Sequence, residues 1–199
     1  MIPWIQTRRS IRKYKPAPVS EEDIKTILQA GILAPSSKNR QPWKFIVVSG
    51  HARKGMTEAM RQGLEREMNS PKDALLPDSR QHLKGAEHTL HIMEQAPATI
   101  LIVNTLGLGL SAPLTPEERI YEICNYQSIG AAIENMTLEA AKLGLGSLWI
   151  CDIFFAYREL KEWMNAEGEL AAALSIGYGD ETPAPRPRRP LKEVTTWRN

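Results

Sequence analysis

The sequence has few of the features that are typical of secreted proteins, membrane proteins or proteins stabilised by a metal ion. It contains two cysteines in 199 residues, Cys124 and Cys151, far apart and in apolar surroundings, so it has neither a disulfide framework nor zinc-ligand spacing. No apolar run approaches the roughly 20 residues of a membrane-spanning helix, and the N-terminus lacks the apolar core of a secretory signal. We therefore expect a reduced, cytoplasmic protein without a membrane segment.

The chain also lacks a large charge excess and the usual nucleotide-binding loops. Its formal net charge is only +2, so overall electrostatics do not predict nucleic-acid binding. The Gly-x-Gly pairs at 107–109 and 144–146 have no third glycine, and the pair at 177–179 leads into a proline-rich segment and not into a helix. No Walker A loop is present. A dinucleotide bound in a Rossmann or P-loop pocket is poorly supported.

The basic residues are unevenly distributed along the chain. Basic residues cluster over residues 8–15 and recur after residue 185. Two basic clusters on a near-neutral chain predict one anionic site built from both ends, because guanidinium groups bind phosphate through paired hydrogen bonds. The residues proposed to hold a phosphomonoester are Arg8, Arg12, Arg186 and Arg188, with the hydroxyls of Ser10 and Ser36. The alternative is that both clusters are solvated surface.

Hydrophobic periodicity predicts an α+β fold over one domain, residues 1–199. We expect helices at 3–9, 20–33, 51–68, 80–95, 116–143 and 157–164, and buried strands at 44–49, 98–103, 146–151 and 170–178. Ser20 is predicted to cap its helix, and Gly144 to end the long one. Loops are expected at 69–79 and 107–116. Residues from about 180 to 199, rich in Pro and Arg, are expected to form an extended arm.

Three other kinds of site find weaker support. His82, His88 and His91 lie near carboxylates on an expected helix, yet solvent-facing histidines are the more common case, so we predict no metal site. Cys151 ends an apolar strand and has no local catalytic partner, so an inert core thiol is the ordinary interpretation. Nucleic-acid binding through the basic N-terminal segment, with Trp4 and Tyr14 for stacking, is the main non-enzymatic alternative.

Five motifs together resemble the nitroreductase family of FMN-dependent oxidoreductases over nearly the whole chain. Each is modest alone, but their order and spacing are specific. They are Arg8-Arg9-Ser10-Ile11-Arg12, residues 34–45 (APSSKNRQPWKF), residues 129–136 (IGAAIENM), residues 143–150 (LGLGSLWI) and residues 185–191 (PRPRRPL).

The resemblance implies a homodimer with a mixed, mainly antiparallel sheet flanked by helices. It also implies two tightly but non-covalently bound FMN molecules at the subunit interface. The long helix ending near Leu143 would form much of that interface, and the C-terminal arm would wrap the partner subunit.

The resemblance also implies roles for individual residues. Arg8, Arg9, Ser10, Arg186 and Arg188 would bind the phosphate and ribityl chain, and Arg12 would lie near N1 and the C2 carbonyl of the flavin. Ser128 is a further contact, and the backbone at Ile150, Cys151 and Asp152 would pass near flavin N5. The residues expected from the other subunit are Pro35, Ser36, Ser37 and Asn39. No side chain is assigned a catalytic role, because the flavin carries the chemistry.

The implied activity is ping-pong hydride transfer from NAD(P)H, through flavin N5, to nitroaromatics, quinones or similar small acceptors. Two alternatives stay open: a flavin-binding storage or sensor protein, and another flavin chemistry such as dehalogenation or flavin cleavage. The residues of 64–95 and 104–118, expected to cover the substrate face, match no subgroup pattern. They give neither the acceptor nor a preference between NADH and NADPH.

Overall fold

The fold is built on one four-stranded antiparallel sheet. A computed structural model describes residues 1–70, 72 and 74–198. The strands lie in the order β1-β2-β4-β3, and every neighbouring pair is antiparallel. Their bounds are Trp43–Ser49 for β1, Ala98–Asn104 for β2, Gly146–Ile150 for β3 and Glu169–Gly177 for β4. The expected mainly antiparallel sheet is confirmed. The parallel pairing in the described chain is an isolated bridge between Ser10 and Ser147.

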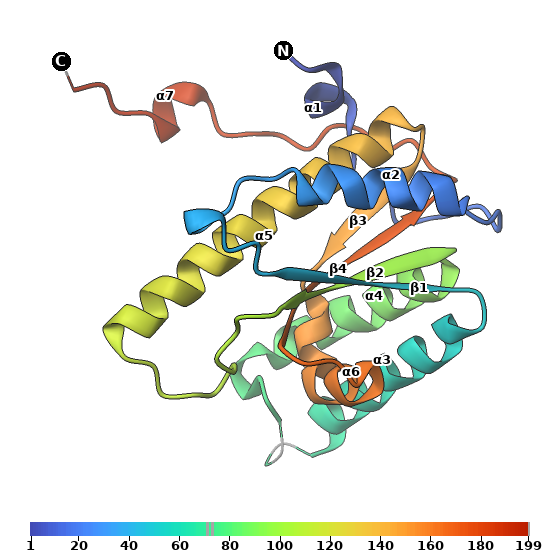
Figure 1. Ribbon diagram of the computed structural model, residues 1–199. Coiled ribbons are helices and arrows are strands. Elements are labelled where there is room, and N and C mark those ends of the chain that lie inside the picture. The colour runs from blue at the N-terminus through green and yellow to red at the C-terminus, as the bar shows by residue number, and fades with distance from the viewer. Residues whose placement is uncertain (71, 73, 199) are drawn as a thin grey trace.

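Helices cover both faces of the sheet (Figure 1). One face carries α2 (Glu21–Ile32) and α5 (Pro116–Lys142), and the other carries α3 (Ala52–Asn69), α4 (Leu83–Gln95) and α6 (Tyr157–Met164). The central strands β2 and β4 are therefore covered on both sides, and each of their residues is buried. This explains why their sequences are continuous apolar runs with little alternation.

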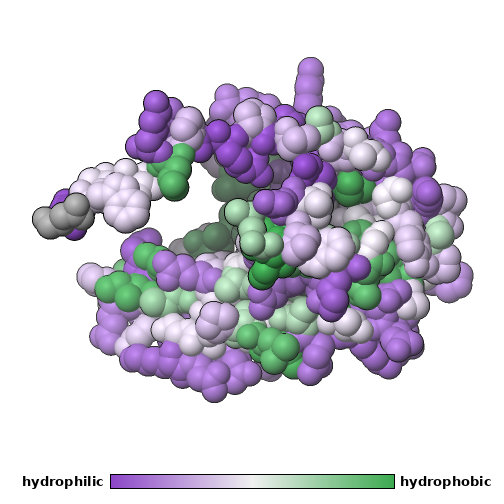
Figure 2. Space-filling model, turned by 90° about the horizontal axis from the view of Figure 1, so that it is seen from above, coloured by the Kyte–Doolittle hydropathy of each residue, from purple (hydrophilic) through white to green (hydrophobic). Residues whose placement is uncertain are grey.

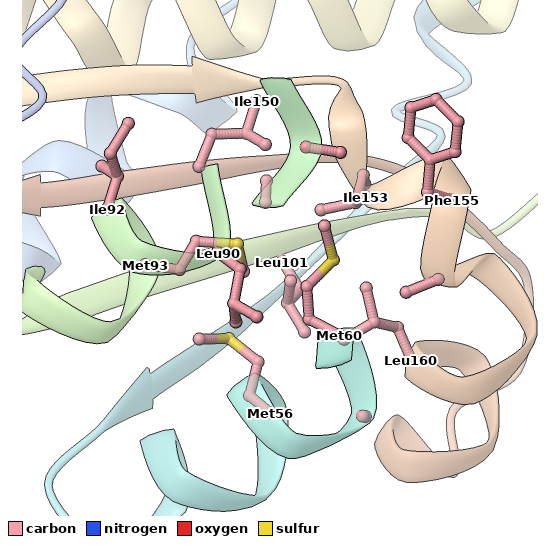
Figure 3. Close-up of a cluster of buried hydrophobic side chains, with 14 of the residues drawn as sticks. Met56, Met60, Leu90, Ile92, Met93, Leu101, Ile150, Ile153, Phe155 and Leu160 are labelled. Atoms are coloured by element: carbon pink, nitrogen blue, oxygen red, sulfur yellow. The ribbon is translucent and has the colours of Figure 1, made fainter. Parts of the chain in front are cut away.

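Each face of the sheet has its own hydrophobic cluster. Met56, Met60, Met93 and Leu101 meet between β2, α3 and α4 (Figure 3). On the other face, Ile100 and Ile102 of β2 pack with buried residues of α2 and α5. Leu101 points to the first cluster and its two neighbours to the second, as the two-residue period of a strand requires.

Local signals set the ends of the two helices next to the candidate site. Ser20 Oγ accepts the N–H of Asp23, which confirms the predicted cap of α2, and α2 ends at Ile32 shortly before Pro35. Thr115 and Glu118 form a complete capping box at the start of α5. At its other end Gly144 has φ +76° and Leu145 N–H donates to Ala140 O at 2.8 Å, which closes a Schellman motif.

All the expected helices and strands are present, with differences at their ends. The helix expected at 80–95 begins as a 3₁₀ turn, Pro77–His82, before α4, so the loop expected at 69–79 is shorter than predicted. Pro71 and Asp73 of that loop lie outside the described residues. A further 3₁₀ turn, Asp152–Ala156, follows β3 and was not expected.

The two ends of the chain lie on the same side of the molecule (Figure 1). The helix expected at 3–9 is shorter, α1 (Pro3–Thr7), and the arm carries one short helix, α7 (Leu191–Val194), which the sequence did not predict. Figure 2 shows the C-terminal end of the arm standing away from the body, with an open hollow between them. No helix in the described ranges is both long and apolar enough to cross a bilayer.

Candidate functional site

Basic residues from both ends of the chain line one cavity of about 250 Å³, called here the basic cavity. The N-terminal segment and the arm each supply one wall, as the sequence predicted. The polar and charged residues that line it are Gln6, Arg8, Arg9, Ser10, Arg12, Arg186 and Arg188.

Backbone hydrogen bonds hold the N-terminal wall against the sheet. Ile11 N–H donates to Ser147 O at 3.0 Å, and Lys15 N–H donates to Tyr178 O at 2.9 Å. The segment 10–15 is thus fixed beside β3 and beside the residues after β4. Its approach is close, because a Cβ on Gly146 would lie 2.7 Å from Ile11 Cγ1. The side chains that flank Ile11, Ser10 and Arg12, are thereby positioned at the cavity.

The guanidinium groups of the basic cavity have few anionic partners. Among the described residues the carboxylate nearest to any of them is Glu134, whose Oε1 lies 4.0 Å from Arg8 Nε. Arg9 donates to the carbonyls of Gln6 and Arg8, and Arg188 donates to those of Arg186 and Pro187. Five arginines thus line one cavity, and Glu134 is the carboxylate within 4.0 Å of a guanidinium group among them.

Two acidic residues near this cavity were not predicted from the sequence. Glu134 of α5 is one, and Glu181 is the other, because its Oε1 accepts the backbone N–H of Arg12. The Glu181 contact ties the start of the arm to the N-terminal segment. No local pattern marks either residue, because each contact joins parts of the chain more than 100 residues apart.

The second predicted stretch, Pro35 to Asn39, lies on α5 and not in the basic cavity. Lys38, Asn39 and Gln41 have positive φ values of 51°, 54° and 48°. Ser36 Oγ accepts the N–H of Gln41 at 3.0 Å, which stabilises this tight turn. Ser37 N–H donates to Ser128 Oγ at 3.2 Å, so the predicted Ser128 belongs with this loop.

The loop and the basic cavity contact different stretches of α5. Ser128, beside the loop, and Glu134, beside Arg8, are six residues apart, which is about 9 Å along a helix. No cavity described in this chain is lined by both the loop and the N-terminal arginines. Within one chain the loop and the N-terminal arginines therefore form two separate groups.

The end of β3 forms a third part of the predicted site. Ile150 is buried and pairs with Ala173, whereas Cys151 is exposed just beyond the strand. The interpretation of Cys151 as a core thiol is therefore wrong, because β3 stops one residue before it. Although the residue is exposed, desolvation of its sulfur by neighbouring atoms, and then the charge of Asp152, raise the pKa of its thiol. Asp152 itself accepts a hydrogen bond from the Thr89 hydroxyl.

The histidines of α4 form no metal site. His91 Nδ1 lies 3.0 Å from Glu94 Oε2 on the same helix. Across the described ranges no three His, Cys, Asp or Glu side chains are grouped so that they would hold a metal ion.

The fold and the sequence together show which family this chain represents. A profile of the nitroreductase family matches residues 5–178. A 5,6-dimethylbenzimidazole synthase from Rhodospirillum rubrum is 30% identical over 193 residues, covering 95% of this chain and 83% of the relative. The chain belongs to the nitroreductase family.

Solved structures support the same assignment. A BluB-like flavoprotein from Clostridium difficile has a TM-score of 0.73 and 26% identity, covering 99% of this chain and 98% of its own. A nitroreductase-type protein from Desulfovibrio desulfuricans, solved in complex with FMN, has a TM-score of 0.69 and 28% identity, covering 99% and 95%. The family and fold expected from the five motifs are confirmed.

Proposed function

We propose that the protein is an FMN-dependent oxidoreductase that takes electrons from NAD(P)H and reduces nitroaromatics, quinones or similar small acceptors. The observation that carries this proposal is the basic cavity, which five arginines from the two chain ends line, with one carboxylate 4.0 Å from the Arg8 guanidinium. Such a set of planar guanidinium groups, each able to donate paired hydrogen bonds, is suited to bind a phosphomonoester. The FMN complex of the Desulfovibrio desulfuricans relative supports the choice of ligand.

The chain's residues fit FMN in distinct roles. Arg8, Arg186 and Arg188 bind the phosphate, with Arg9 and Ser10 completing the wall beside it. When bound, FMN would supply hydride-transfer chemistry at its N5 atom. Arg12 would stabilise negative charge on the N1 and C2 side of the ring, because a fixed cation stabilises charge without reorganisation.

We further propose that the site is completed across a homodimer, in which Pro35, Ser36, Ser37, Asn39 and Ser128 come from the second copy. The separation of the loop from the basic cavity within one chain supports this. So does the arm, where Leu191, Val194 and Trp197 are 73%, 57% and 81% exposed. Large apolar side chains on a segment without a core of its own are typical of a surface that another chain covers.

Mixed dimers test the shared site. One copy would carry Arg188→Ala and the other Ser36→Ala together with Asn39→Ala. If the site is composite, the mixed dimer regains one intact FMN site, and each parent homodimer binds FMN weakly at both. A mixed dimer that binds no better than the parents, or a monomer in light scattering that retains FMN, contradicts the proposal.

An anaerobic titration tests the activity. The purified protein should be yellow, and NADH or NADPH should bleach the flavin absorbance before any acceptor is added. Addition of a quinone or nitroaromatic should then restore the absorbance. A colourless protein that takes up no FMN contradicts the proposal. A yellow protein that neither nicotinamide reduces is instead a flavin store or sensor.

A second candidate is a reaction that consumes the flavin. The 30% identity to a 5,6-dimethylbenzimidazole synthase favours it. Under this alternative, reduced flavin incubated with the protein in air would disappear and a benzimidazole would form, as measured by chromatography. Quantitative recovery of FMN after many turnovers excludes it.

We place either activity in the cytoplasm, consistent with two free cysteines.

A further inference from the structure

Two basic side chains of the loop before β1 lie against one tyrosine of α5. Lys38 Nζ is 5.8 Å from the centroid of the Tyr121 ring, and the guanidinium carbon of Arg40 is 5.0 Å from it. Both distances are within the range of about 6 Å at which an aromatic ring attracts a cation. Lys38 is exposed and Arg40 is half-buried, so both remain open to a ligand from solvent. These two side chains are called here the cation pair.

The cation pair has no ion-pair partner among the residues that the structure describes. The carboxylate that reaches Tyr121 is that of Glu117, and its Oε1 accepts the tyrosine hydroxyl at 2.8 Å. Its neighbour Glu118 accepts from the backbone N–H and the hydroxyl of Thr115 at the start of α5. Two like charges are therefore held on one ring while the nearby acids on α5 bind other groups.

The backbone that carries the cation pair is held in an uncommon conformation. Lys38 has φ +51° and Gln41 has φ +48°, and the left-handed region costs a residue with a side chain about 1–2 kcal/mol. Hydrogen bonds hold the turn, because Asn39 N–H donates to Ser36 O at 2.9 Å and Gln41 N–H donates to Ser36 Oγ at 3.0 Å. Glycine would adopt this conformation at Lys38 without the cost. Strain of this kind is concentrated at ligand-binding and active sites.

A phosphomonoester is the ligand group that suits the cation pair. Such a group carries a charge of about −1.5 to −2 at pH 7. Lysine offers it a compact charge, and arginine offers a planar group that donates paired hydrogen bonds. NADPH differs from NADH by one phosphomonoester, on the 2′ position of the adenosine, and basic side chains commonly accommodate that phosphate.

We propose that the cation pair binds the 2′-phosphate of NADPH, so that the protein uses NADPH in preference to NADH. The inference rests on the proposed function, because in the proposed dimer this loop borders the flavin of the second copy. Ser37 and Asn39, on either side of Lys38, contact that flavin there. The nicotinamide ring stacks on the flavin, and the adenosine end of the coenzyme lies along the rim of the site, where the cation pair meets its phosphate.

Adenosine fragments test the recognition without any turnover. 2′,5′-ADP carries the phosphate that distinguishes NADPH, and 5′-AMP is the matching fragment of NADH. Calorimetry on the purified protein with FMN added should show that 2′,5′-ADP binds roughly tenfold more tightly, the effect of one charged hydrogen bond. The difference should shrink as salt is added, because exposed charges are screened. Equal affinity for the two fragments overturns the inference.

The fragment measurement also separates this inference from the proposed function. A protein that distinguishes the fragments, but whose flavin neither coenzyme reduces, retains the phosphate site and loses the proposed activity. A protein that both coenzymes reduce equally well, and that binds the two fragments equally, retains the activity and loses the phosphate site.

Substitutions in the loop identify the phosphate that is bound. Lys38→Gly and Arg40→Gln should each lower the ratio of kcat/KM for NADPH to that for NADH roughly tenfold. Lys38→Gly should not lower the melting temperature, because glycine relieves the left-handed strain. The control is Lys25→Gln, which removes one charge from a residue of α2 that pairs with Glu21 at 2.7 Å and should leave the ratio unchanged. Weaker FMN binding with an unchanged ratio would assign the cation pair to the FMN phosphate and refute the inference.

Tyr121 is a positioning residue for the cation pair. Tyr121→Phe keeps the ring and loses only the hydroxyl that Glu117 accepts, so the coenzyme ratio and the fragment preference should be retained. Tyr121→Leu removes the ring, so both should fall severalfold, since the cations lose the surface that holds them. A preference that survives in Tyr121→Leu would show that the ring does not position the cation pair.

Discussion

Ile11 and Ser147 join the basic N-terminal segment to the sheet. The backbone N–H of Ile11 donates to the Ser147 carbonyl at 3.0 Å, and the side chain of Ile11 covers Gly146. The residues on either side of Ile11 are Ser10 and Arg12, which line the basic cavity. The geometry of the proposed phosphate site therefore depends on a contact with β3 that carries no charge.

Gly146→Ala should weaken FMN binding without touching the ligand. The new Cβ would lie 2.7 Å from Ile11 Cγ1, so the N-terminal segment must move away from β3. Overpacking of this kind costs about 1–3 kcal/mol, and FMN affinity measured by fluorescence quenching should fall with it. Gly85→Ala is the control, because a Cβ there meets nothing within 4 Å. Equal FMN affinity in the two variants would show that the contact is not needed.

Arg188→Ala should lower FMN affinity through the phosphate. Loss of a charged hydrogen bond costs about 1.5–3 kcal/mol, roughly tenfold or more in Kd. Riboflavin, which has no phosphate, should bind the variant and the natural protein equally. The matched control is Arg189→Ala, because Arg189 pairs with Glu193 at 3.4 Å and does not line the basic cavity. Unchanged FMN affinity in Arg188→Ala removes this residue from the phosphate site.

Arg12→Gln should make the bound flavin harder to reduce. Without the cation, the charge at N1 and the C2 oxygen is less stabilised, and each 1.4 kcal/mol lowers a two-electron potential by about 30 mV. Arg12→Lys should restore part of the loss, because it retains the charge. The measurement is an anaerobic redox titration with a reference dye. A potential unaffected by both substitutions places Arg12 away from the ring.

Glu159→Gln should destabilise the protein at neutral pH and less so in acid. Arg66 Nε donates to Glu159 Oε1 at 2.6 Å and Nη1 also pairs with Glu67, which is fully buried. Burial is the largest single influence and raises the pKa of Glu159, but the hydrogen bonds from Arg66 and from a backbone N–H, together with the charges of Arg66 and Arg158, outweigh it and hold that pKa below its ordinary value. A lowered pKa in the folded state contributes stability above the ordinary value of 4.5, and that stability is lost as the pH falls through the folded value.

Urea unfolding at pH 7 and pH 3.5 measures this linkage. At pH 7 the loss should be about 2 kcal/mol, the worth of a charged hydrogen bond, and the gap to the natural protein should narrow at pH 3.5. The control is Glu65→Gln on the exposed side of α3, for which a change within about 0.5 kcal/mol is expected at both pH values. A gap that widens in acid would mean that the pKa of Glu159 is raised and not lowered.

The sequence predicted those features that depend on neighbours in the chain. Pro35 stops α2 and Gly144 stops α5 through local backbone geometry, and both helix ends lie where these residues place them. Five ordered motifs gave the family, and the two basic ends gave the residues of one cavity. Cys151 was misjudged because a strand end one residue earlier changes a side chain from buried to exposed.

Features set by distant contacts were not predictable in the same way. Asn125 is an ordinary residue of an expected helix, and the burial of its amide without a hydrogen-bond partner in the described chain becomes visible only when α5 packs on the sheet. The contact between Glu181 and Arg12 likewise joins residues 169 positions apart. Separation of the loop at Pro35–Asn39 from the basic cavity follows from the length of α5 and not from any motif.

Loss of the arm should lower cofactor affinity without lowering folding stability. Nearly every residue from Ala184 to Arg198 is exposed, and none belongs to either hydrophobic cluster. A protease cut after Thr182 would remove two of the five guanidinium groups and leave both clusters whole. If bound FMN holds the arm in place, saturating FMN should slow its cleavage, so the cleavage rate would report how much of the site is occupied. The cut protein should melt at nearly the same temperature as the intact apoprotein.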